Sequence, residues 1–175
     1  MSFIIKNYGH TLTNEILEQL KTQFNRIDTD GTGYISYVEV SEAFSTPNFQ
    51  FPASAAKLLS RVFSSQCQLD QEQFSSLYAF VLCVNEAFRN NNQAQSMSIP
   101  EIKQALLELN LNFTKSAIIA LCENFGQGSI GLEQFYSISS MCLLGRKLFV
   151  EWDHQDKGEI TVGLEQVLRI AMWFM

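Results

Sequence analysis

The sequence has little of what several large functional classes require. It carries 12 lysines and arginines against 18 aspartates and glutamates, a formal net charge of −6, and its basic residues form no cluster. Because nucleic-acid binding depends on neutralising phosphates with lysine and arginine, we expect no nucleic-acid partner. Histidine occurs only at His10 and His154, neither in a recognisable catalytic context, so we expect no enzymatic activity.

Cysteine is scarce, and long apolar runs are missing. The four cysteines, Cys67, Cys83, Cys122 and Cys142, are widely spaced and form no CxxC pair. This pattern favours buried free thiols in a reducing compartment, with two disulfides as the alternative. No run approaches the roughly 20 apolar residues of a membrane span, and the triplet at residues 3–5 is too short for a signal peptide. We expect a cytoplasmic protein that associates with membranes or granules only indirectly.

What the sequence does contain is the twelve-residue segment DTDGTGYISYVE, with oxygen donors where a calcium loop needs them. The carboxylates of Asp28 and Asp30 fall at positions 1 and 3, and the hydroxyl of Thr32 falls at position 5. Tyr34 offers its backbone carbonyl at position 7, and Glu39 at position 12 can close the shell with both carboxylate oxygens. Since hard cations prefer oxygen ligands, these five residues predict a Ca²⁺ site.

The neighbouring residues support this loop. Gly33 stands at position 6, where the chain turns sharply, and Ser36 at position 9 can contribute directly or through a water. An apolar stripe at helical spacing leads into the loop after a cap at Thr13 or Asn14, and the exiting helix stops before Pro47. With three carboxylates only, we expect a calcium dissociation constant of about 10⁻⁶ to 10⁻⁴ M.

The helix-loop-helix pattern repeats along the chain. Position 8 of a calcium loop carries an apolar residue that bridges to a second loop, and here it is Ile35. Equivalent residues follow at Leu69, at Met97 or Ile99, at Ile130 and at Ile160, and with Ile99 the spacings are 34, 30, 31 and 30 residues. We expect an all-α fold with short β-bridges between paired loops. It comprises a short lead over residues 1–12 and one compact, two-lobed domain over residues 13–175 with five EF-hands, near 14–46, 53–80, 81–109, 114–140 and 143–175.

Three of the other loops have lost the calcium ligands. The second and fourth are too short for a twelve-residue loop in the same frame. In the third, Asn90 and Asn92 could precede Glu101, but Ala94 and Gln95 occupy the places of a ligand and a glycine. We therefore expect no calcium in the second, third or fourth hand.

The fifth loop keeps part of the pattern. It places Asp153 at position 1, Gly158 at position 6 and Ile160 at position 8, but Lys157 at position 5 and Leu164 at position 12. A lysine ammonium inside the ring of ligands repels a divalent cation. We therefore predict that this loop is a structural hand.

The chain resembles the penta-EF-hand family, which includes the calpain small subunit, sorcin, grancalcin and the grainins. The resemblance rests on the intact first loop and on two C-terminal features. These features are the FxxWD pattern from Phe149 to Asp153 and the apolar helix that Glu165 and Gln166 open. The resemblance implies dimerisation through the fifth hand. The chain departs from the family pattern in its short N-terminal lead and in a third loop without ligands.

The fifth hand is the odd one out if hands pair through position 8. The segment that follows it carries an apolar stripe, made of Leu164, Val167, Leu168, Ala171, Met172 and Phe174, which Trp173 and Met175 widen. Because an exposed stripe promotes aggregation, pairing of this hand with a second chain is favoured over a tail folded onto its own lobe. The second chain can be identical, in a homodimer, or different, in a heterodimer.

Together these features predict a calcium-binding sensor or adaptor. Inward movement of Glu39 would shift the helix that follows it and alter an apolar surface offered to a protein or peptide target. Phe24, Phe44, Phe49, Phe51 and Met97 are candidates for that surface, although core packing is the favoured interpretation for each of them. A calcium buffer or storage protein, or a regulatory subunit of a calpain-like protease, is the alternative function.

Overall fold

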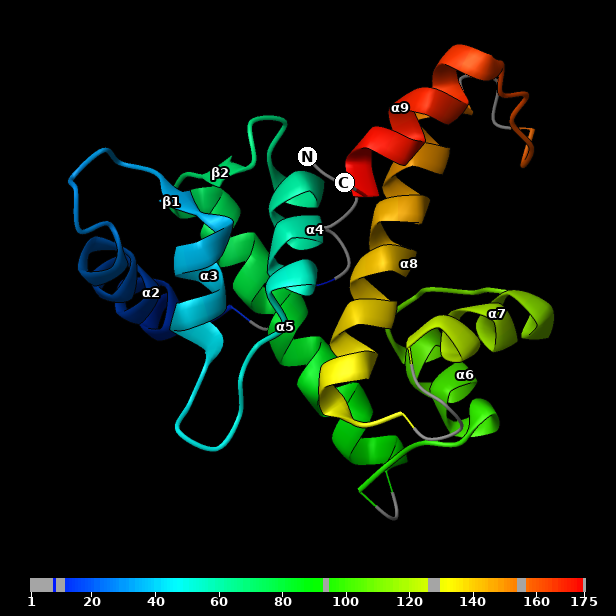
Figure 1. The fold of residues 1–175 in the computed structure, drawn as a ribbon. Coiled ribbons are helices and arrows are strands. Elements are labelled where there is room, and N and C mark those ends of the chain that lie inside the picture. The colour runs from blue at the N-terminus through cyan, green and yellow to red at the C-terminus, as the bar shows by residue number, and fades with distance from the viewer. Residues whose placement is uncertain (1–7, 9–11, 93–94, 126–129, 154–156, 175) are drawn as a thin grey trace.

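The computed structural model describes Tyr8 and residues 12–92, 95–125, 130–153 and 157–174. In chain order its elements are α2 (Asn14–Ile27), β1 (Ile35–Ser36), α3 (Tyr37–Phe44), α4 (Ala53–Phe63), β2 (Gln68–Leu69), α5 (Gln71–Asn91), α6 (Ile99–Glu108), α7 (Lys115–Phe125), α8 (Leu132–Trp152) and α9 (Leu164–Phe174). Figure 1 shows the elements from α2 to α3 on one side and α6 and α7 on the other, with α5 and α8 running between them. The predicted all-α, EF-hand fold is confirmed.

The loops join in pairs through short antiparallel contacts. Ile35 of β1 pairs with Leu69 of β2, so the first and second hands share a two-stranded sheet. Met97 pairs with Ile130 in an isolated bridge, which joins the third and fourth hands. Of the two residues that the sequence offered for the third hand, the structure therefore selects Met97 and not Ile99.

The helices α5 and α8 are each 21 residues long and serve two hands at once. Residues 80 and 81, between the predicted second and third hands, lie inside α5, and residues 141 and 142 lie inside α8. No proline interrupts either helix, so each continues from one hand to the next. These shared helices make the five units one body.

The helix α4 lies at the centre of the packing. It contacts α3, α5, α8 and α9. Beside it, the segment between α3 and α4 inserts Phe51, which is 1% exposed and packs against Tyr136 of α8 with ring centroids 4.6 Å apart. Contacts of this kind fix the calcium-loop side of the molecule against the C-terminal helices.

The five residues considered for a responsive apolar surface belong to the core. Phe24, Phe51 and Met97 are buried, and Phe44 and Phe49 are partly buried and pack against the same cluster. The favoured interpretation, core packing, is therefore correct. Their large apolar area makes burial favourable by roughly 1.5–3 kcal/mol for a fully buried side chain.

Tyr8, in the N-terminal lead, has a structural role that the sequence did not reveal. Tyr8 is 2% exposed, packs edge-on against Phe80 with centroids 5.1 Å apart, and donates a hydrogen bond from its hydroxyl to the Leu109 carbonyl. Burial raises the pKa of this phenol above its ordinary value. Tyr8 thus ties the lead to α5 and to the end of α6.

All four cysteines have free thiols, as predicted. The predicted burial is confirmed for Cys122 and Cys142 and is wrong for Cys67 and Cys83, which are only partly buried. Burial raises the pKa of Cys142 to about 12 and raises that of Cys83 above its usual value. None of the helices in the described part of the chain is long and apolar enough to cross a membrane.

Candidate metal centre

The first loop is held between two well-defined helix ends. The N–H of Asp28 donates to the Phe24 carbonyl (2.9 Å), which closes the last turn of α2. Gly31 and Gly33 then take left-handed backbone angles, with φ of 67° and 78°. A side chain is strained in this region, so Gly33 has the conformational role that its position predicted.

Two of the predicted carboxylates meet in the loop. Asp28 accepts hydrogen bonds from the N–H groups of Thr32 (3.0 Å) and Gly33 (2.9 Å), and Asp30 accepts from the same Thr32 N–H (3.2 Å). The Thr32 hydroxyl donates to the Tyr34 carbonyl (3.1 Å). Hydrogen bonds from Thr32 lower the pKa of Asp30, so its carboxylate form is favoured. Four predicted donors therefore lie together.

The fifth predicted donor lies apart from them. One carboxylate oxygen of Glu39 accepts from the Ser36 N–H (2.7 Å) and from the Ser36 hydroxyl (2.8 Å), and the Glu39 N–H points back to Ser36 Oγ (3.4 Å). This capping box begins α3. Within the residues that the structure describes, no three carboxylate, imidazole or thiol groups are close enough together to hold a metal ion.

The donor set nevertheless fits calcium once Glu39 turns away from Ser36. All five donors are oxygens, which is the chemistry that a hard cation requires. Glu39 has rotatable side-chain bonds, and its second oxygen is not part of the capping box. The loop thus holds Asp28, Asp30, Thr32 and Tyr34 in place, while Glu39 is the donor that must move.

The third loop has the backbone of a calcium hand without its ligands. Ser98 and Glu101 form the same capping box as Ser36 and Glu39, with the Ser98 N–H 2.7 Å from the Glu101 carboxylate. Gln95, two residues before the bridging residue Met97, takes a positive φ of 64°. Hydrogen bonds from Ser98 lower the pKa of Glu101. The sequence signal for this hand was the four-residue interval from Met97 to Glu101, equal to that from Ile35 to Glu39.

The asparagines of the third loop are engaged elsewhere. The side-chain amides of Asn90 and Asn91 donate to the two carboxylate oxygens of Glu108, at 3.3 and 2.9 Å. Ala94, at the place of a ligand, lies outside the described residues. The third loop therefore keeps the capping box of a hand, whereas the side chains of Asn90 and Asn91 bind Glu108.

Replacing Gln95 with glycine is expected to stabilise the fold. A non-glycine residue at φ of 64° is strained, and the left-handed region costs an L-residue about 1–2 kcal/mol. Part of that gain is offset by the freedom of glycine in the unfolded chain, so we expect a net increase of about 1 kcal/mol in the free energy of unfolding. Urea unfolding measures it, with Gln104→Gly, inside the exposed face of α6, as the control that should destabilise.

The described residues of the fifth loop repeat backbone contacts of the first loop. Asp153 accepts hydrogen bonds from the N–H groups of Lys157 (2.9 Å) and Gly158 (2.8 Å), and Gly158 has a positive φ of 76°. Glu165, one residue beyond position 12, pairs with Arg169 (2.9 Å). His154, like His10, lies outside the described residues. Ile160 forms no bridge with another described segment, so this hand differs from the bridged pairs.

Comparison with known proteins finds relatives in sequence and in structure. No protein-family model matches the chain. Peflin from Homo sapiens is 24% identical over 157 residues, which cover 85% of this chain and 55% of that protein, and Peflin from Mus musculus is 24% identical with 85% and 57% covered. The chain thus spans little more than half the length of the curated relatives it matches.

A solved structure has the same fold. It is that of a homolog of programmed cell death 6 protein from Leishmania major Friedlin, with a TM-score of 0.62, 23% identity and coverage of 89% of this chain and 90% of that chain. The Peflin sequences support the resemblance to the penta-EF-hand family, and the solved structure shows that the fold is shared. The structure has two bridged pairs of hands and a fifth hand whose loop forms no bridge among the described residues.

Proposed function

We propose that this penta-EF-hand protein is a non-enzymatic, calcium-responsive adaptor that binds one calcium ion at the first loop and dimerises through the fifth hand. The observation that carries the proposal is where exposed apolar side chains gather. Of the ten large ones in the described part of the chain, six lie on the fifth hand, namely Val150, Val162, Leu164, Val167, Leu168 and Met172. The other four, Leu17, Tyr34, Val38 and Leu107, are scattered.

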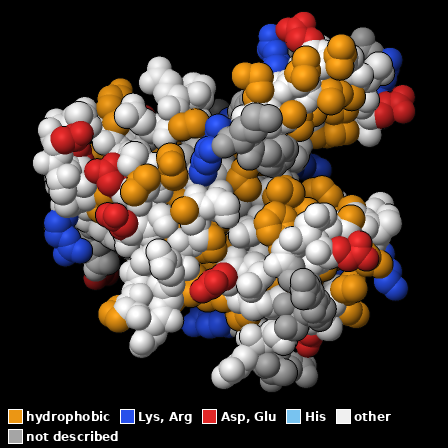
Figure 2. Space-filling view, in the orientation of Figure 1, with side chains coloured by type: hydrophobic (Ala, Val, Ile, Leu, Met, Phe, Trp, Pro, Cys, Tyr) orange, Lys and Arg blue, Asp and Glu red, His pale blue; other side chains and the backbone are white. Residues whose placement is uncertain are grey.

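The apolar face of α9 is an interaction surface. Leu164 is 77% exposed and Met172 is 65% exposed, and Figure 2 shows hydrophobic side chains gathered over this end of the molecule. Ile170 packs against the core and anchors the helix from its other side. Because an apolar patch of this kind invites association, a second copy of the chain that covers it is the simplest closed solution. A heterodimer, such as a protease regulatory subunit forms, is the alternative.

The first loop supplies the response to calcium. Asp28, Asp30, Thr32 and Tyr34 already lie together, and Glu39 closes the shell by leaving the capping box with Ser36. That departure changes the start of α3, which packs against α4. A conformational response of this kind supports an adaptor for protein or peptide targets in the cytoplasm, with any attachment to membranes or granules made through those targets.

The test combines light scattering, calorimetry and binding of a hydrophobic dye, each with and without calcium. We expect one calcium per chain, a dissociation constant of about 10⁻⁶ to 10⁻⁴ M and a dimer at micromolar concentration. A monomer under both conditions would contradict dimerisation. Calcium binding with unchanged dye fluorescence would identify a buffer or storage protein, and the absence of heat up to millimolar calcium would refute the calcium site.

A further inference from the structure

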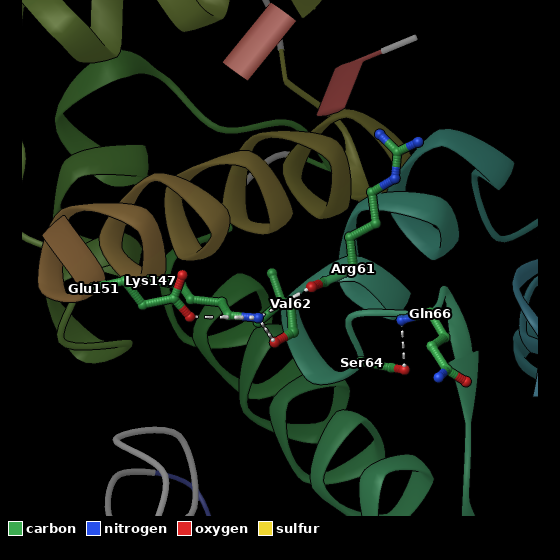
Figure 3. A network of polar contacts seen from close by, with 6 residues as sticks. All are labelled: Arg61, Val62, Ser64, Gln66, Lys147 and Glu151. Carbon is green, nitrogen blue, oxygen red and sulfur yellow. Dashed lines mark hydrogen bonds and ion pairs between the residues drawn. The ribbon is translucent and has the colours of Figure 1, made fainter. Parts of the chain in front are cut away.

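The end of α4 is held by a lysine from α8. Lys147 donates hydrogen bonds from its ammonium group to the carbonyls of Arg61 (3.2 Å) and Val62 (2.8 Å), and it pairs with Glu151 (3.7 Å). Figure 3 shows these contacts converging on the last turn of α4. The last carbonyls of a helix have no partner within the helix and carry partial negative charge. Lys147 therefore caps α4 and joins it to the helix that enters the fifth hand.

The same turn of α4 also holds α9. The guanidinium of Arg61 donates to the carbonyl of Met172 (3.4 Å), near the end of α9. A cavity of about 260 Å³ adjoins this contact, lined by Arg61, Ser64, Ser65, Cys67, Arg169 and Met172. Arg61 thus contacts both helices of the fifth hand. Its carbonyl accepts from Lys147 of α8, and its side chain donates to Met172 of α9.

A short link connects this junction to the first loop. Only residues 64–67 separate the end of α4 from β2, where Leu69 pairs with Ile35 of the first loop. Ser64 continues the helix with an N–H bond to the Ser60 carbonyl (2.8 Å), and Gln66 donates its N–H to Ser64 Oγ (3.2 Å; Figure 3). The helix α3, which follows the first loop, also packs directly on α4. The first loop is therefore connected to the end of α4 in two ways, through β2 and through α3.

We propose that the junction of Arg61, Lys147 and Met172 couples the first loop to α9, so that calcium binding loosens α9 and makes its apolar face more available. The proposal rests on the proposed function. The junction contacts belong to the conformation in which Glu39 is in the capping box with Ser36. A ligand that favours a different position of Glu39 also favours different positions of α3 and α4. It therefore weakens the contacts that belong to the conformation with Glu39 in the capping box.

Reciprocity fixes the direction of the effect on calcium affinity. Contacts that stabilise only the metal-free conformation oppose binding, so their removal strengthens it. We expect the Lys147→Met substitution, which removes the ammonium group and keeps most of the unbranched side chain, to lower the calcium dissociation constant about fivefold by calorimetry. Arg61→Gln removes only the side-chain contact with Met172, and we expect a shift in the same direction. Lys103→Met, at an exposed position of α6, is the matched control and should leave the constant unchanged.

Hydrogen exchange of α9 provides a readout that does not depend on affinity. In the wild type, calcium should increase exchange over residues 164–172 and speed alkylation of Cys67 in the cavity wall, with Cys122 and Cys142 as buried internal references. Hydrogen exchange is measured at two protein concentrations, because exchange that results from dissociation of the dimer depends on concentration and exchange that results from the coupling within one chain does not. In Lys147→Met, exchange should already be high without calcium.

The outcomes separate the two proposals. Calcium binding that leaves exchange in α9 and alkylation of Cys67 unchanged overturns the coupling and leaves the calcium site intact. Unchanged affinity in both folded variants overturns it as well. If the Lys147→Met variant unfolds at a much lower temperature than the wild type, the calcium affinity of Arg61→Gln alone decides whether the coupling exists. No calcium heat in the wild type refutes the proposed function itself and, with it, the coupling.

Discussion

Replacing Glu39 with glutamine is expected to weaken calcium binding at least about 100-fold, since even groups that only support metal ligands are worth 10- to 100-fold. Glutamine has one neutral oxygen in place of two charged ones, so the shell loses a bidentate ligand. The substitution separates binding from folding, because a glutamine at this position can still accept a hydrogen bond from the Ser36 N–H and start α3. Calorimetric titration measures the loss, and urea unfolding should show little change.

Glu42→Gln is the matched control for Glu39→Gln. It makes the same chemical change on the same helix, at an exposed position. We expect its calcium affinity and unfolding midpoint to equal those of the wild type. If Glu39→Gln binds calcium as the wild type does, the metal is held elsewhere, and the assignment of Asp28, Asp30, Thr32, Tyr34 and Glu39 as ligands is wrong.

Replacing Leu168 with glutamate is expected to weaken the dimer at least about 100-fold. Leu168 is 56% exposed on the face of α9 that we assign to the interface. A carboxylate buried there without a partner loses its hydration, and the two-fold symmetry of a homodimer repeats this penalty in both chains. Sedimentation equilibrium over a concentration series measures the dissociation constant, and calcium titration should still find one site per chain.

Leu107→Glu tests whether the location of the substitution decides the outcome. Leu107 is 39% exposed on α6, outside the fifth hand, and the change of side chain is identical. We expect a dimer with the affinity of the wild type. Loss of the dimer in Leu107→Glu, or its persistence in Leu168→Glu, would place the interface elsewhere on the molecule.

Local residue order was enough to predict the helix-loop-helix units and the pairing residue of the first loop. The bridge of Ile35 with Leu69 follows from an apolar residue at position 8, a position that the loop fixes by its own length. For the third hand the sequence left Met97 and Ile99 open, because both are apolar and near the right spacing. Only the partner strand decided for Met97, which pairs with Ile130.

The anchoring of the lead and of the aromatic residues needed the tertiary structure. Tyr8 meets Phe80 and the carbonyl of Leu109, about 70 and 100 residues away in sequence, so no local pattern announces it. Phe51 likewise is core because Tyr136 of α8 covers it. Periodicity gives the face of a helix on which an apolar side chain lies, and what covers that face depends on the packing of distant helices.

The sequence by itself determined the chemistry of the first loop, because the donors at positions 1, 3, 5, 7 and 12 all belong to one short segment whose turn Gly33 permits. The contact of Glu39 with Ser36 is local as well, because the two residues lie three positions apart in one capping box. The position of α4 against α8 and α9 was decided only by the tertiary structure, since the contacts that hold it join residues more than 80 positions apart. Ligand identity depends on the order of residues within one loop, whereas the packing of the helices around that loop depends on residues distant in the sequence.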